Sequence, residues 1–157
     1  MAFRTTGLRL TGALALLAFG LAVLWVLRPQ SATGPAGIGP DDPTQVALGE
    51  KLYARHCASC HGANRQGQPD WQQRRADGKL PAPPQDESGH SWHHSDDVLF
   101  RLTRDGLASF AGSDYATDMP AFKGKLDDAE IAAIIAFIKS RWPANIRQVQ
   151  DQLNKAK

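Results

Sequence analysis

The feature that most constrains this chain is a C-x-x-C-H run formed by Cys57, Cys60 and His61, which holds the only two cysteines of the sequence. Two thiols at this spacing can each add to a vinyl group of a haem, while the adjacent imidazole ligates the iron. We therefore expect one covalent haem c. A covalently held haem supplies apolar core around which long loops can pack.

Two other uses of the cysteine pair fit the sequence less well. A structural zinc site needs four protein ligands, so histidines from elsewhere would have to converge on the one pair available. A thioredoxin-like redox pair expects a βαβ context, whereas the residues flanking 57–61 have helical spacing and turn-forming character. Haem attachment is the interpretation that needs no further ligands.

Apolar spacing predicts helices and no strand. A first helix of about ten to twelve residues leads from Val46 into the haem motif. A helix at about 96–104 has Ser95 as its N-cap. An Asp-x-x-Glu capping box begins a last helix over 127–142, which Pro143 ends. The sequence therefore predicts an all-α fold with long connecting loops.

The N-terminus carries an uncharged run from Leu10 to Leu27, preceded by Arg4 and Arg9. Eighteen such residues are at the lower edge of what spans a bilayer as a helix. The run is long for a cleavable signal and lacks a small-x-small site directly after it. We expect residues 1–28 to form an N-terminal transmembrane helix, with a cleaved secretory signal as the alternative.

Composition divides the remainder of the chain. Segment 29–44 has four prolines and three glycines and is predicted to be a tether. The haem domain is expected over 45–143, followed by a C-terminal tail over 144–157 that contains a short helix. Residues 29–157 contain 15 of the 18 Lys and Arg and all 16 Asp and Glu, so their net charge is close to zero. This balance indicates no nucleic-acid partner.

Apart from the initiator, the only methionine is Met119, which lies with Pro120 in a breaker-rich loop ahead of the last helix. A lone methionine more often fills a gap in a core. Met119, however, has no helical periodicity with apolar neighbours. A loop position leaves its thioether available as a second ligand of the haem iron.

The ordered set of Gly49, Tyr53, the C-x-x-C-H run, Met119 with Pro120, and the 127–142 helix resembles a class I monohaem c-type cytochrome, here a membrane-anchored bacterial one. The resemblance covers about residues 44–143. It implies three to four helices around one haem, with His61 and Met119 as the iron ligands. It also implies that the first and last helices cross near perpendicular at Gly49, Tyr53 and Phe137.

The resemblance further implies a proline whose carbonyl accepts the ring N–H of His61, and Pro83 or Pro84 is the candidate. About twenty residues separate His61 from these prolines, more than in the compact family pattern. The additional segment, 63–80, has no role that the sequence reveals. Its Arg74 and Arg75 are expected to be solvated, with pairing to a haem propionate as the alternative.

A cluster of His90, Trp92, His93 and His94 is the other unusual feature. We expect it to line the haem edge, with the Trp92 indole N–H on a propionate and His94 or Ser95 capping the following helix. Two alternatives are a second metal site and displacement of Met119 by a histidine.

A His/Met-ligated haem has no open coordination site, so the chemistry expected is one-electron transfer rather than enzymatic turnover. We expect a carrier in the bacterial inner membrane, single-pass, with its haem domain in the periplasm. Its donor would be a quinol-oxidising complex or dehydrogenase and its acceptor a terminal oxidase. The alternatives are a cytochrome subunit of a larger oxidase or dehydrogenase complex, or a haem sensor or peroxidase.

Overall fold

The computed structural model describes residues 37–156, in which all regular structure is helical and no strand is formed. The elements are α2 (Pro43–His56), α3 (Ala58–His61), the 3-10 helix η1 (Ser91–His93), α4 (Asp96–Asp105), α5 (Ala108–Ala111), α6 (Asp128–Ser140) and α7 (Ala144–Lys155). The all-α fold predicted from the sequence is confirmed for these residues.

Helix α6 is the centre of the core. Its start is fixed by the predicted capping box, because Asp127 accepts from the Glu130 amide at 2.8 Å and Glu130 accepts from the Asp127 amide at 3.0 Å. Every residue from Ile131 to Lys139 is buried. Helices α2 and α4 pack against it, and the core also contains Leu52, Tyr53, Phe100, Phe122, Leu126 and Trp142.

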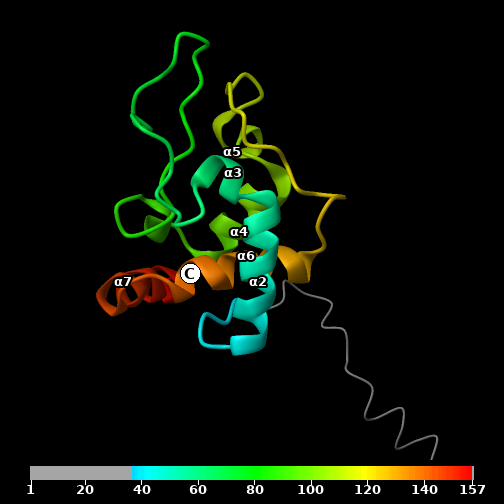
Figure 1. Ribbon diagram of the computed structural model, residues 1–157, viewed down its shortest axis with the longest axis vertical. Helices are drawn as coiled ribbons and strands as arrows, with labels where there is room; N and C mark the ends of the chain where they lie inside the picture. Colours follow the sequence, from blue (N-terminus) through cyan, green and yellow to red (C-terminus); the bar gives the residue numbers. More distant parts are fainter. Residues whose placement is uncertain (1–36, 157) are drawn as a thin grey trace, which may run out of the picture. The chain divides into compact units, whose positions relative to one another are not determined.

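Helix α2 crosses α6 (Figure 1). At the crossing point there is no room for a side chain on α2. A Cβ atom at Gly49 would lie 1.9 Å from the carbonyl oxygen of Ala133 and 2.8 Å from the Cβ of Phe137. The rings of Tyr53 and Phe137 pack beside this point, 5.3 Å apart and tilted by 51°. The contact implied for Gly49, Tyr53 and Phe137 is therefore present.

The N-terminal end of the described chain is held to the domain. The side chain of Gln45 accepts from the Gly39 amide at 2.7 Å and donates to the carbonyl of Gly37 at 2.9 Å. Asp42 caps α2 by accepting from two amides of its first turn. Residues 37–44 are the last part of the predicted tether. They thus form the start of α2 and a preceding segment that is hydrogen-bonded to this helix.

The predicted C-terminal tail contains α7, a regular helix of twelve residues that packs against η1. Gln150 of α7 is fully buried, and its amide nitrogen donates to a carboxylate oxygen of Asp96 at 2.7 Å. Helix α7 is therefore part of the same folded unit as α4 and α6.

No helix within residues 37–156 is both long and apolar enough to span a bilayer. The transmembrane helix predicted for residues 1–28 lies outside the described residues.

Candidate haem site

The C-x-x-C-H run forms a single helical turn directly after α2. The carbonyl of Cys57 accepts from the amides of Cys60 at 3.1 Å and of His61 at 2.9 Å. Both cysteines are free thiols, with Cys57 half-buried and Cys60 exposed. One turn of backbone therefore brings together the two thiols and the imidazole that haem attachment requires.

His61 is buried, and its ring nitrogen Nδ1 lies 2.8 Å from the carbonyl oxygen of Pro83. A carbonyl only accepts, so Nδ1 carries the proton and Nε2 keeps the lone pair that a metal needs. Burial lowers the pKa of His61, against the opposing effect of the bond to Pro83. The ring is thus held neutral, which is the form that ligates iron.

Gly67 lets the chain around Pro83 approach His61. Its φ is +70°, and a Cβ there would lie 2.5 Å from the nitrogen of Pro84 and 2.7 Å from the carbonyl carbon of Pro83. The Gly67 amide also donates to the His61 carbonyl at 2.8 Å. The sequence alone does not single out Gly67, although a glycine is the residue type that such a close approach demands.

Tyr53 connects the helix crossing to the attachment turn. Its hydroxyl donates to the carbonyl oxygen of Gly62 at 2.9 Å, one residue after His61. Burial is the largest cause of the raised pKa of Tyr53, so the phenol stays protonated and keeps donating. The α2–α6 packing therefore fixes the backbone that carries His61.

The structure gives no support to the other two uses of the cysteines. Burial, together with the neighbouring Cys60, raises the pKa of the Cys57 thiol to about 12. A redox-active pair needs a lowered thiol pKa. In the described part of the chain, no three His, Cys, Asp or Glu side chains gather as a metal site. Neither a reactive dithiol nor a zinc site is formed here.

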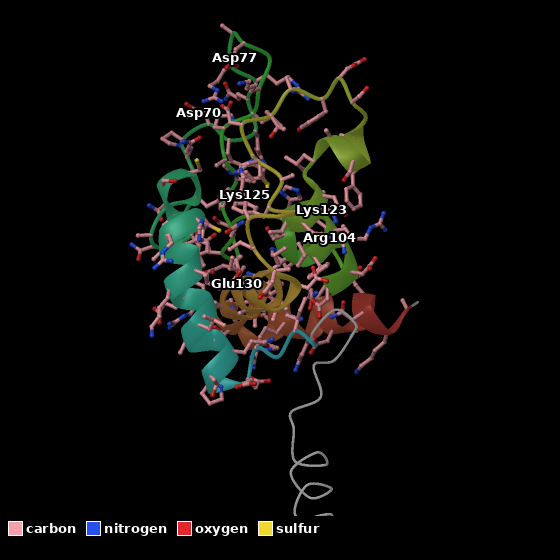
Figure 2. The ribbon with its side chains drawn as sticks, turned by 90° about the vertical axis from the view of Figure 1, so that its right-hand side faces the viewer. Asp70, Asp77, Arg104, Lys123, Lys125 and Glu130 are labelled. Carbon is pink, nitrogen blue, oxygen red and sulfur yellow. The ribbon has the colours of Figure 1, made fainter. Side chains whose placement is uncertain are left out.

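Met119 is half-buried in the loop between α5 and α6, and its amide donates to the hydroxyl of Thr117 at 3.0 Å. Downstream, this loop is tied to α4, because the Phe122 amide donates to the carbonyl of Thr103 at 3.2 Å and the Lys123 amide to that of Arg104 at 2.8 Å. Figure 2 labels Arg104 and Lys123 near this junction. Ligation of the iron by Met119 stays a prediction.

The histidine cluster is organised by ring contacts. His90 stacks on Trp71 with centroids 5.7 Å apart, and His93 stacks on Trp92 at 3.6 Å. The indole N–H of Trp92 donates to the carbonyl of Gly89 at 3.0 Å, and its expected bond to a propionate stays a prediction. With no metal cluster among residues 37–156, a second metal site at these histidines is not supported.

The predicted capping of α4 also needs correction. Ser95 occupies the N-cap position, but its hydroxyl makes no capping hydrogen bond. The Asp96 amide instead donates to the side-chain oxygen of Asn154 at 2.8 Å. The Asp96 amide, which has no partner within α4, is therefore hydrogen-bonded by a side chain of α7, in the segment that was predicted to be a C-terminal tail.

A family model described as cytochrome c matches residues 46–142, from the first turn of α2 to the end of the core. The chain belongs to the cytochrome c family. No curated protein and no solved structure matches it significantly. A cytochrome c domain binds haem c covalently, and Cys57 and Cys60 fit the attachment motif. The unpaired thiols and the neutral, oriented His61 of this cytochrome c domain suit that group.

Proposed function

We propose that this protein is a one-electron carrier in which haem c is ligated by His61 and Met119. The observation that carries the proposal is the attachment turn with its His61 ring fixed by the Pro83 carbonyl at 2.8 Å. An oriented imidazole that donates its second N–H is the usual state of a histidine ligand.

Haem c bound at this turn supplies one-electron oxidation and reduction. The protein's part is to keep the ligand geometry constant in both oxidation states. Burial and the bond to Pro83 prevent rotation of the His61 ring, and a thioether from Met119 would favour ferrous iron and raise the potential. With the haem iron held by both His61 and Met119, small molecules would have no free site, which favours electron transfer over catalysis.

We further propose that residues 1–28 anchor the protein in the bacterial inner membrane, with the haem domain on the periplasmic face. The uncharged run Leu10–Leu27 behind two arginines supports this orientation. The donor would be a quinol-oxidising complex or dehydrogenase, and the acceptor a terminal oxidase. A near-neutral domain gives no electrostatic reason for a nucleic-acid partner.

The carrier role is tested with the purified, haem-loaded full chain added to membranes from the producing bacterium. Substrate-driven quinol oxidation should reduce the ferric protein, and an oxidase inhibitor should leave it reduced. The ferrous protein should bind carbon monoxide slowly at neutral pH, because Met119 blocks the site. Rapid carbon monoxide binding or turnover of peroxide would favour the sensor or peroxidase alternative.

The anchor has its own test. The mature protein should begin near Met1 and remain in membranes through a high-salt wash, since salt does not screen the burial of an apolar helix. A soluble periplasmic form that begins near Gly37 would refute the anchor and leave the carrier role intact.

A further inference from the structure

The segment that separates the attachment turn from Pro83 forms a closed loop over residues 68–82, here called the 68–82 loop. The Gln68 amide donates to the Ala82 carbonyl at 2.9 Å, and the Ala82 amide donates to the Gln68 side chain at 2.9 Å. Near its far end, the Arg75 amide donates to the Lys79 carbonyl at 2.9 Å. Figure 2 labels Asp77 at this far end.

Besides the stacking of Trp71 on His90, this loop contacts the residues just before Met119. Asp118 forms ion pairs with both the Arg75 guanidinium and the Lys79 ammonium. The Arg74 guanidinium lies 5.5 Å from the centre of the Tyr115 ring. Three side-chain contacts thus join the 68–82 loop to segment 115–118, although about forty residues separate them in sequence.

The two sides of Met119 are held in different ways. Downstream, backbone hydrogen bonds from Phe122 and Lys123 fix the chain to α4. Upstream, the bonds of segment 112–119 are local ones, such as the Tyr115 amide to the Gly112 carbonyl at 3.1 Å. The ion pairs of Arg75 and Lys79 with Asp118 are therefore what ties the segment upstream of Met119 to a distant part of the chain. A single exposed ion pair contributes little, but here two cations share one carboxylate.

We propose that the 68–82 loop is a clamp that positions Met119, with Arg75 and Lys79 as positioning residues acting through Asp118. The proposal rests on Met119 as iron ligand. By restricting excursions of residues 113–119, the clamp keeps the thioether at the iron and lowers the population of an open state that an external ligand could capture.

The test uses the haem-loaded full chain with Asp118→Asn and with the double variant Arg75→Gln, Lys79→Gln. Asp41→Asn is the matched control, because Asp41 forms an exposed ion pair with Arg147 at 2.8 Å elsewhere in the fold. Two quantities are measured: hydrogen–deuterium exchange of the 113–119 amides, and imidazole binding to the ferric protein followed by the thioether–iron band.

In both clamp variants, exchange of the 113–119 amides and imidazole affinity should each rise about 3- to 10-fold. Asp41→Asn should change neither. The charge reversal Asp118→Lys with Arg75→Glu and Lys79→Glu should restore slow exchange, which separates the ion pairs from a general loss of structure. High salt should mimic the variants in the wild type.

Two results would overturn the clamp in distinguishable ways. If the wild type has the thioether band but the clamp variants match Asp41→Asn, the 68–82 loop does not position Met119 and the carrier proposal stands. If the wild type lacks the band, Met119 is not the ligand, and both the clamp and the His61/Met119 ligation fall together.

Discussion

Lys139 of α6 is almost fully buried, and its ammonium nitrogen lies 2.7 and 2.8 Å from the two carboxylate oxygens of Asp96 at the start of α4. Gln150 of α7 donates to the same carboxylate at 2.7 Å and to the His94 carbonyl at 3.2 Å. One carboxylate therefore joins three helices. Removing it would leave a buried ammonium without a counter-charge, which is costly.

We predict that Asp96→Asn lowers the free energy of unfolding of the haem-loaded protein by about 2 kcal/mol, less than for a fully buried pair because the Asp96 side chain is 28 % exposed. Lys139→Met should cost less, since Asp96 keeps Gln150 and access to water. Urea denaturation followed by far-ultraviolet circular dichroism measures both. Equal losses in the two variants would contradict the asymmetry.

Much of this fold could be predicted from local sequence signals. The helical spacing before Cys57, the capping box of Asp127 and Glu130, and the stop at Pro143 all act within a few residues, and the structure has helices close to the predicted bounds. The proline partner of His61 was narrowed to two residues by family resemblance, and the hydrogen bond selects Pro83.

The parts that could not be predicted depend on contacts distant in sequence. Helix α7 has few apolar residues; Ile146 packs against the core, while the polar side chains of Gln150 and Asn154 find distant partners at the start of α4. The ion pairs of Asp118 with the 68–82 loop are equally non-local.

Gly49→Ala should destabilise the domain by about 3 kcal/mol or more. The added methyl would meet the backbone carbonyl of Ala133, which cannot move without displacing α6. Gly37→Ala is the control, because a Cβ there has nothing within 4 Å. Thermal unfolding of the haem-loaded proteins compares them. If the unfolding temperature of Gly49→Ala equalled that of Gly37→Ala, the prediction would be wrong, because α2 and α6 could then move apart without loss of stability.

Gly67→Ala should weaken the hydrogen bond from His61 to Pro83, since the methyl would push against the 82–84 backbone. Loss of this bond makes the imidazole a poorer electron donor, so the reduction potential should rise. Gly78→Ala is the control: its φ of +80° carries the same backbone strain, but a Cβ there meets nothing within 4 Å. Redox titration measures the difference. Equal potentials would contradict the proposed tuning.

His94 should contribute to loss of stability in acid. Burial, with smaller effects from His90 and His93, lowers the pKa of His94. The unfolded chain then binds a proton more readily than the folded one, so stability falls as pH drops below the ordinary value of about 6.5. His94→Gln should make the free energy of unfolding decline less between about pH 7 and pH 5. Urea titrations at each pH measure this, and an unchanged slope would contradict it.

The absorption spectrum of the oxidised, haem-loaded protein tests the central claim most directly. If Met119 ligates the iron opposite His61, the wild type should show the weak near-infrared band of a thioether on ferric iron. Met119→Ala should abolish the band and lower the potential, whereas His93→Ala and His94→Ala should leave both unchanged. A wild-type spectrum with two nitrogen ligands, unaltered by Met119→Ala, would contradict the account.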